Sequence, residues 1–298
     1  MNTTVMQIDR SAAGLARAVI GIFKLRIGVL IMITALAGVA ITPGAGLSLV
    51  QTVVLALAVL VASAAAGAFN QYVEADSDRL MVRTRRRPFA SGALQRSPLW
   101  LGLFALLLAG AVGAAWWALN AASAIFIFLG AFFYGVVYTV WLKRRSWLNI
   151  VVGGASGSFA VLAGGAAVDP ALGALPLLLA LVLFLWTPPH FWSLAIAGQA
   201  DYAAAGVPML PVVAGTERAA RVVYMHSIAL VAASLLPGFF GAGVVYSVGA
   251  LAGGAYFLHR TRVLARAPSR QTAMAAFFAS MVQLSVLLAA VTIDAVVR

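Results

Sequence analysis

The sequence predicts an all-α polytopic membrane protein, with nine transmembrane helices around a central cavity that opens to the cytoplasmic face. Three features of composition predict this class: 63% of the 298 residues are hydrophobic, 9% are charged, and the mean hydropathy is +1.01. About a quarter of the residues of a soluble domain are charged, whereas a membrane span needs about 20 apolar residues. A soluble enzyme, a disulfide scaffold and a disordered chain are therefore excluded. The absence of cysteine also excludes thiolate chemistry.

Apolar runs separated by polar breaks define the predicted spans. Their ranges are 22–42, 49–68, 98–119, 121–141, 148–166, 172–194, 221–240, 243–259 and 274–294. Every basic residue except Arg298 falls on one side of the membrane that these spans define. Because cytoplasmic loops are rich in Lys and Arg, we predict a bacterial plasma (inner) membrane protein with its N-terminus cytoplasmic and its C-terminus outside. The net charge of +12 then marks topology in a lipid bilayer, and no nucleic acid partner is predicted.

Acidic residues concentrate in two cytoplasmic segments, about residues 69–97 and 195–220, which hold five of the 8 acids. Long connections in a compact protein commonly carry function, so we predict that both are active-site loops. Each follows an even-numbered span, and the two lie four spans apart. We therefore predict a single transmembrane domain over residues 1–298, built from two pseudo-repeated four-helix halves plus a ninth helix.

The first segment carries Asn70, Glu74 and Asp78 at four-residue intervals. If the second span continues as a helix, these side chains form one stripe, because residues four apart are neighbours on a helix face. Mg²⁺ is commonly held by one or two carboxylates together with substrate phosphate oxygens, so the stripe predicts a Mg²⁺ site. Asp76 points to the other side of this helix. It is expected to pair with an arginine, with a supporting role at the metal as the alternative.

Arginines follow the acids at the same interval, at Arg79, Arg83 and Arg87. The arginine fork matches two phosphate oxygens at once. Acids that hold a metal beside bases that hold phosphate predict a diphosphate site at the membrane face. The alternative for the arginines is a solvated loop that only follows the positive-inside rule.

The sixth predicted span contains Pro188 and Pro189, which we expect to break or kink it. His190 follows at once, between aromatic residues. An ionisable group within a span is a functional candidate, although a hydrogen-bonded core histidine is an equal alternative. His226 and His259 lie near predicted helix ends and match no motif, so a structural role is expected for both.

These motifs together resemble the intramembrane prenyltransferases of the UbiA type. The superfamily pattern is the Asn-x-x-x-Glu-x-x-x-Asp motif after the second span, an acidic segment after the sixth span, and nine helices. The strings RTRRRP, WTPPHFW and DYAAAGVPMLP, at residues 83–88, 186–192 and 201–211, resemble the branch of that family that modifies heme.

The resemblance implies a reaction in which a farnesyl group passes from farnesyl diphosphate to a vinyl group of protoheme IX, with water adding, to give heme O for terminal oxidases. Mg²⁺ would be the cofactor and heme a substrate. A heme A synthase would be a possible partner. The implied catalytic and metal-binding residues are Asn70, Glu74, Asp78 and Asp201. Diphosphate would be bound by Arg79, Arg83 and Arg87. Heme would be contacted by His190 and Tyr202, with His190 acting as an axial ligand or through a propionate.

The chain departs from the family pattern just before Asp201. The family usually carries basic residues and a further acid there, whereas this chain has Gly198-Gln199-Ala200. The number of Mg²⁺ ions is therefore open, because Asp201 is the one acid left at the second site.

Two other functions remain open from the sequence. One is a related prenyltransferase that uses 4-hydroxybenzoate, another quinone precursor or a chlorophyll-type acceptor. The other is a membrane transporter, because broken helices and ionisable groups within spans are expected there too.

Overall fold

The computed structural model describes residues 11–297, which form helices without a β-strand among them. The long elements are α2 (Leu25–Ile41), α3 (Leu49–Val73), α6 (Pro98–Ala118), α7 (Ala121–Phe132), the π-helix η1 (Phe133–Leu142), α9 (Ala155–Val168), α10 (Ala174–Ala197), α13 (Thr216–Leu235), α14 (Val244–Arg266) and α15 (Arg270–Val297). The short ones are α1 (Ala12–Ile22), α4 (Ala75–Arg79), α5 (Pro88–Ser91), α8 (Asn149–Gly153), α11 (Gln199–Ala204), α12 (Leu210–Ala214) and the 3-10 turn η2 (Leu236–Phe240). The predicted all-α class is confirmed; Arg298 lies outside the described residues.

Eight helical stretches within residues 11–297 are long and apolar enough to cross a membrane, so the chain is a multi-pass membrane protein. They coincide with eight predicted spans to within a few residues at most ends; the fourth, predicted at 121–141, is Ala121–Leu142. The predicted span at 243–259 corresponds to α14. This helix is long enough, but its last turns carry His259, Arg260 and Arg262, and it is not among the eight. The count of nine spans therefore stays a prediction.

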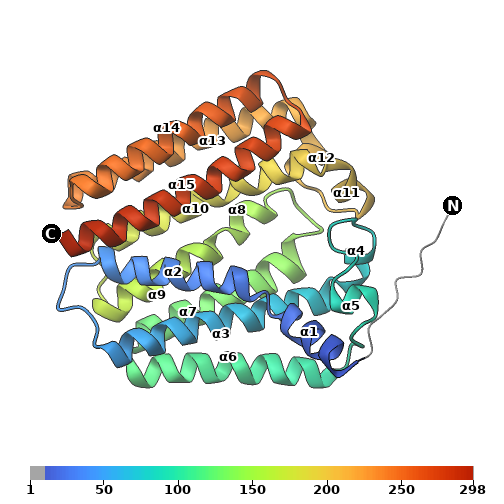
Figure 1. The fold of residues 1–298 in the computed structure, drawn as a ribbon, viewed down its shortest axis with the longest axis horizontal. Coiled ribbons are helices and arrows are strands. Elements are labelled where there is room, and N and C mark those ends of the chain that lie inside the picture. The colour runs from blue at the N-terminus through green and yellow to red at the C-terminus, as the bar shows by residue number, and fades with distance from the viewer. Residues whose placement is uncertain (1–10, 298) are drawn as a thin grey trace.

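The helices form two groups that lie side by side (Figure 1). Helices α2, α3, α6, α7 and α9 pack in one group, and α10, α13, α14 and α15 pack in the other. Contacts between α9 and α10 and between α15 and α2 join them. The predicted internal repeat of two halves plus a ninth helix stays a prediction.

Glycines set the close contact between α2 and α9. A Cβ atom at Gly164 would collide with the carbonyl oxygen of Ala35, and one at Gly38 would collide with that of Val161. Membrane helices approach closely where small residues face each other. This contact fixes α2, and with it Lys24 at its N-terminal end, against the rest of the first group.

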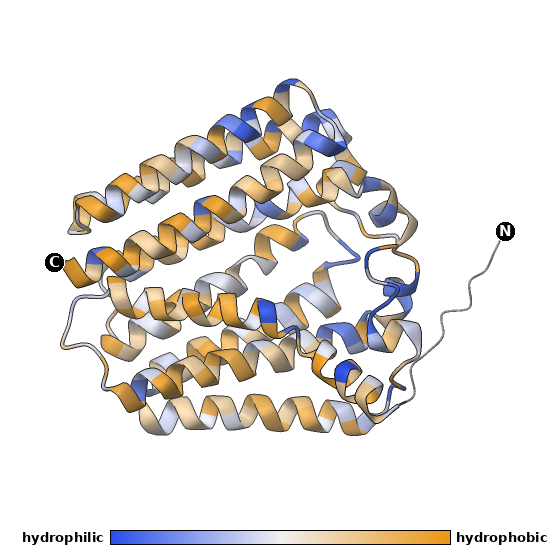
Figure 2. Cartoon of the chain, in the orientation of Figure 1, coloured by the Kyte–Doolittle hydropathy of each residue, from blue (hydrophilic) through white to orange (hydrophobic). Residues whose placement is uncertain are grey.

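Hydrophilic residues concentrate at the end of the bundle where α4, α5 and α11 lie (Figure 2). The apolar bodies of the long helices occupy the rest of the molecule. The two predicted active-site loops, at 69–97 and 195–220, correspond to this end and contain several short helices.

Of the expected break or kink at Pro188 and Pro189, the break is wrong, because α10 continues through both prolines to Ala197; a kink stays a prediction. Prolines remove backbone donors, so the carbonyls of Phe184 and Leu185 lose their helical partners, which membrane helices tolerate where the surrounding protein takes up the freed groups. The hydroxyl groups nearby bond to neighbouring carbonyls: Ser193 Oγ donates to Pro189 at 2.7 Å and Thr187 Oγ1 donates to Leu183 at 3.1 Å.

The helix that begins as α7 widens into the π-helix η1. The Lys143 N–H donates to the Tyr138 carbonyl, five residues earlier, at 2.9 Å. Stretches of π-helix are rare and are frequent at functional sites. Here the wider turns carry Tyr134, Tyr138 and Thr139 toward the end of α3.

Candidate active site

The first motif lies where α3 passes into α4. Asn70 is in the last turn of α3, Glu74 is at the junction, and Asp78 is in α4. Although α3 ends at Val73, the Glu74 N–H donates to the Asn70 carbonyl at 3.0 Å and the Asp78 N–H donates to the Glu74 carbonyl at 2.8 Å. The four-residue step therefore runs across the junction, and the three residues are only 2%, 3% and 2% exposed, respectively.

Two bases hold the carboxylates of this motif. One nitrogen of Arg87 donates to both oxygens of Asp78, at 2.8 and 3.0 Å, and lies 3.9 Å from Glu74 Oε2. Lys143, just after η1, forms an ion pair with Glu74 Oε1. Neither base was assigned by the sequence to these particular acids.

Lys24 adds a third base at the break between α1 and α2. It adopts a left-handed backbone conformation, with φ 49°, which is strained for a residue other than glycine. Its ammonium group donates to Asn70 Oδ1 at 2.6 Å and to the Tyr134 hydroxyl at 3.3 Å. Asn70 Nδ2 in turn donates to Thr139 Oγ1 at 3.0 Å. We call Asn70, Glu74, Asp78 and the bases Lys24, Arg87 and Lys143 the charged cluster.

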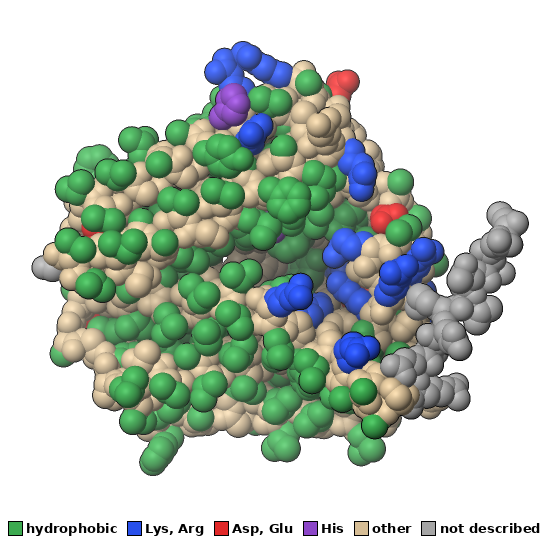
Figure 3. Space-filling model, in the orientation of Figure 1, with side chains coloured by type: hydrophobic (Ala, Val, Ile, Leu, Met, Phe, Trp, Pro, Cys, Tyr) green, Lys and Arg blue, Asp and Glu red, His purple; other side chains and the backbone are tan. Residues whose placement is uncertain are grey.

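Two tyrosine rings from η1 border the charged cluster. Tyr134 and Tyr138 stack with centroids 5.7 Å apart, and the ammonium groups of Lys24 and Lys143 lie 5.8 and 5.5 Å from their respective centroids. On the face drawn in Figure 3, the surface is hollowed between the two helix groups. Hydrophobic side chains line the hollow, and Lys and Arg side chains gather beside it.

Other predicted residues of the first segment lie apart from the cluster. Asp76 is exposed and pairs with Arg79 at 3.3 Å and Arg96 at 3.0 Å, as expected of an arginine partner. Arg79 also donates to the Ala90 carbonyl at 2.9 Å. Arg83 is exposed. Of the three predicted diphosphate arginines, the structure brings only Arg87 to the acids.

The second segment meets the first through apolar contacts. Tyr202, in α11, is buried in a hydrophobic cluster that also contains Met81. Tyr138 packs against this cluster. Asp201 is half-buried, and within residues 11–297 no three residues among His, Asp and Glu lie close enough together to hold a metal. The structure therefore joins the two segments without bringing Asp201 into a carboxylate triad with Glu74 and Asp78.

His190 lies inside α10, with its ring between two aromatic rings. The centroid of Trp186 is 4.2 Å away and that of Phe277, from α15, is 4.6 Å away, both roughly parallel to the imidazole. The His190 Nδ1 atom lies 2.7 Å from Ser280 Oγ. His190 is thus a hydrogen-bonded histidine in an aromatic setting, within the group of helices opposite the first motif.

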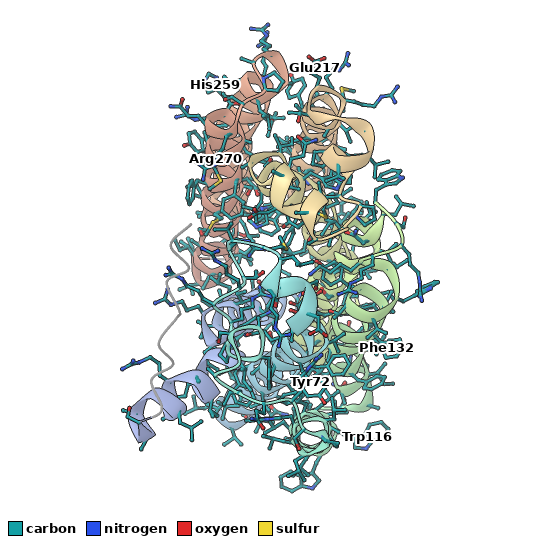
Figure 4. All side chains as sticks on the ribbon, turned by 90° about the vertical axis from the view of Figure 1, so that its right-hand side faces the viewer. Tyr72, Trp116, Phe132, Glu217, His259 and Arg270 are labelled. Atoms are coloured by element: carbon teal, nitrogen blue, oxygen red, sulfur yellow. The ribbon has the colours of Figure 1, made fainter. Side chains whose placement is uncertain are left out.

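The other histidines lie elsewhere. His226, on α13, contacts the edge of the Trp192 ring, with centroids 5.7 Å apart. Figure 4, which looks onto the polar end, places His259 and Glu217 at the far edge of the second helix group, well away from Tyr72 beside the first motif. Trp116 and Phe132 point outward from the first group in the same view.

The charged cluster has the chemistry to hold a divalent cation. Both carboxylate oxygens of Glu74 are buried, and Oε1 has the ion pair with Lys143 while Oε2 has no partner closer than Arg87 at 3.9 Å. A buried carboxylate is costly unless cations compensate it. Two carboxylates and an amide oxygen suit Mg²⁺, which completes its shell with phosphate oxygens and water. A triad of acidic residues is not required.

Sequence reasoning missed Lys24, Lys143, Tyr134 and Tyr138 as site residues. The two lysines were counted only as topology markers. Lys24 stands between apolar stretches of a membrane span, where a charge is costly and usually functional, so it had a readable signal. The tyrosines had none, because aromatic residues are common throughout these spans.

Comparison with known proteins identifies the class. The UbiA prenyltransferase family matches residues 31–282, and the chain belongs to this family. It is therefore a prenyltransferase, and the resemblance read from the motifs is confirmed.

Close relatives share one name. A Paramagnetospirillum magneticum protein named protoheme IX farnesyltransferase 2 is 57% identical over 274 residues, which are 92% of this chain and 95% of the relative. Protoheme IX farnesyltransferase 1 of the same organism is 47% identical over 93% of this chain and 98% of the relative.

Solved structures share the fold at low identity. A digeranylgeranylglyceryl phosphate synthase superposes with a TM-score of 0.78 at 17% identity, covering 95% of this chain and 99% of that one. A UbiA homologue from Archaeoglobus fulgidus bound to DMAPP and Mg²⁺ gives 0.69 at 18% identity, covering 90% and 99%.

Proposed function

We propose that this chain transfers the farnesyl group of farnesyl diphosphate to a vinyl group of protoheme IX, with water adding, and so produces heme O. The observation that carries the acceptor is the 57% identity, over 92% of the chain, to a relative named protoheme IX farnesyltransferase 2. The charged cluster supports the diphosphate half of the reaction, and the apolar hollow supports two hydrophobic substrates.

The bases of the charged cluster would bind the diphosphate. Three bases face two carboxylates, so the buried cluster carries an excess of positive charge that an anion would neutralise. Charge-assisted hydrogen bonds to phosphate are strong, and donors fixed around a leaving group lower the barrier most where negative charge develops. Lys24, Arg87 and Lys143 would therefore stabilise the diphosphate as its bond to the allylic carbon breaks.

Asn70, Glu74 and Asp78 would hold Mg²⁺, with Asp76 outside this set. The ion, when bound, would supply further charge neutralisation to the leaving diphosphate. Asp201 is our candidate for a second acidic site on the opposite segment, with Tyr202 beside it. Arg79 and Arg83 would reach diphosphate only after a movement of the loop between α4 and α5.

Aromatic side chains would stabilise the allylic cation that forms when diphosphate leaves. The faces of Tyr134 and Tyr138 carry negative quadrupole charge that stabilises an allylic cation. His190 and its aromatic neighbours would contact the heme, which is flat and apolar over most of its surface.

We further propose a bacterial inner-membrane location with a cytoplasmic N-terminus and an outer C-terminus. The domain would comprise two four-helix halves and a ninth helix, which corresponds to α15. A heme A synthase would be a plausible consumer of the product, and this partner rests on the family resemblance alone.

The test is product formation in membranes that contain the chain. Farnesyl diphosphate, Mg²⁺ and heme should yield heme O, identified by chromatography and mass spectrometry, and a metal chelator should abolish the yield. Prenylated 4-hydroxybenzoate without heme O would assign the chain to another acceptor. Uptake of a solute without any prenylated product would favour a transporter.

A further inference from the structure

Heme O formation requires a proton acceptor, and the charged cluster does not offer one. The added water becomes a hydroxyl group, so one proton must leave it. Glu74 and Asp78 are held by Lys143 and Arg87. Asp201 lies on α11, beyond the end of the spanning helix α10. A side-chain base near the apolar acceptor, apart from the departing diphosphate, would therefore come from elsewhere in the bundle.

The hydrogen bonds around His190 define which of its nitrogen atoms is free. Ser280 Oγ donates its proton to the Phe277 carbonyl at 2.6 Å, so its lone pairs face His190 Nδ1 at 2.7 Å. With the Ser280 hydroxyl on the Phe277 carbonyl, the tautomer that satisfies both contacts has its proton on Nδ1 and its lone pair on Nε2. Ser280 thus acts as a positioning residue that sets the tautomer.

The free nitrogen borders open space. Nε2 makes no hydrogen bond within the described part of the chain, and it is not fully enclosed by protein atoms. His190 as a whole is 8% exposed. The residual exposure therefore includes a nitrogen able to accept a proton.

The aromatic neighbours suit a base that becomes charged briefly. Trp186 and Phe277 cover both faces of the ring, at 4.2 and 4.6 Å, and aromatic faces stabilise a cation between them. His190 lies seven residues before the end of α10 at Ala197, or about 10 Å along the helix. This places it deeper than the polar end, on the side where an acceptor would meet the farnesyl chain.

We propose that His190 Nε2 accepts the proton from the water that completes the reaction, an inference that rests on the proposed function. The terminal vinyl carbon bonds to C1 of the farnesyl chain as diphosphate leaves with the electron pair of the C1–O bond. The positive charge then lies on the vinyl carbon next to the macrocycle. The water oxygen bonds to that carbon, one water proton passes to Nε2, and the imidazolium later releases it to solvent.

The test compares products of His190→Gln with those of the wild type in water labelled with ¹⁸O. Without His190 to deprotonate the added water, the cation instead loses a proton from its neighbouring carbon to the departed diphosphate, and the product is a farnesylated heme lighter than heme O by one water. We expect heme O formation to fall about 10²-fold, with the dehydrated product in its place. His226→Gln, on the histidine of α13 that contacts Trp192, is the matched control and should keep the wild-type product.

Two further arms keep the inference open to refutation. In His190→Gly, added imidazole should restore the hydroxylated product, and Ser280→Ala, which frees the tautomer, should give both products even if His190 variants fold poorly. A wild-type share of heme O in His190→Gln would overturn the inference. So would loss of the bound-heme absorption spectrum, which would make His190 an axial ligand. If the wild type forms no farnesylated heme, the proposed function fails instead.

Discussion

Two buried aspartates at opposite ends of the molecule have different partners. Asp78 and Asp294 are each 2% exposed. Asp294, near the end of α15, accepts from the backbone N–H groups of Gly243 and Tyr246 at 2.8 and 3.2 Å, where α14 begins. Asp78 is held by the side chain of Arg87. A helix N-terminus cannot leave its cap, whereas a guanidinium can turn to a ligand, so the partner rather than the burial distinguishes a structural acid from a candidate catalytic one.

Substituting the candidate catalytic aspartate, Asp78→Asn, should cause the largest loss of turnover. We expect turnover to fall by about 10²- to 10³-fold, because the charge that would hold Mg²⁺ is lost while the shape remains. Heme O formation measured against the amount of folded protein checks this. Turnover within a few fold of the wild type would remove Asp78 from the metal site.

Lys24→Met should weaken the diphosphate interaction next. Loss of a hydrogen bond to a charged group corresponds to roughly a 10- to 100-fold rise in the KM for farnesyl diphosphate. Steady-state kinetics with varied farnesyl diphosphate measures it. An unchanged KM would mean that Lys24 only supports Asn70.

Asp294→Ala should affect stability and spare the chemistry. Removing an acceptor at a helix N-terminus costs about 1–2 kcal/mol, so the detergent-solubilised protein should have a lower Tm. Turnover per folded molecule should stay at the wild-type value. A selective loss of turnover with unchanged Tm would contradict the structural role of Asp294.

Asp76→Asn should have the smallest effect of the four. Its pairs with Arg79 and Arg96 are exposed, and such pairs contribute about 0–1 kcal/mol. Both Tm and turnover should stay close to those of the wild type. A large loss of turnover would return Asp76 to the metal site.

The sequence predicts the spans well because each one is a local property of the chain. Composition and the placement of Lys and Arg locate the helices, and the interval from Asn70 to Asp78 survives the junction of α3 and α4. The partners of these residues are not local. Lys24 lies 46 residues from Asn70, and Lys143 comes from the far end of η1, so no spacing rule could assign them.

One expectation failed for a physical reason. Pro188 and Pro189 were expected to break or kink the sixth span, but α10 continues through both, because a membrane helix tolerates proline where its neighbours take up the freed backbone groups. Arg83 follows the four-residue interval and is exposed beyond the end of α4 at Arg79, so its diphosphate role stays a prediction. Arg87, at the same interval and also beyond α4, reaches Asp78.

The π-helix η1 makes the site depend on how many residues the chain has, and not only on which ones. Deleting one residue between 133 and 142 would favour an ordinary α-helix and rotate everything beyond it by about 100°. Lys143 would then turn away from Glu74 without any side chain having been replaced. A deletion of one residue in this helix should therefore disturb the site more than most substitutions do. Natural relatives should keep its length even where its residues differ.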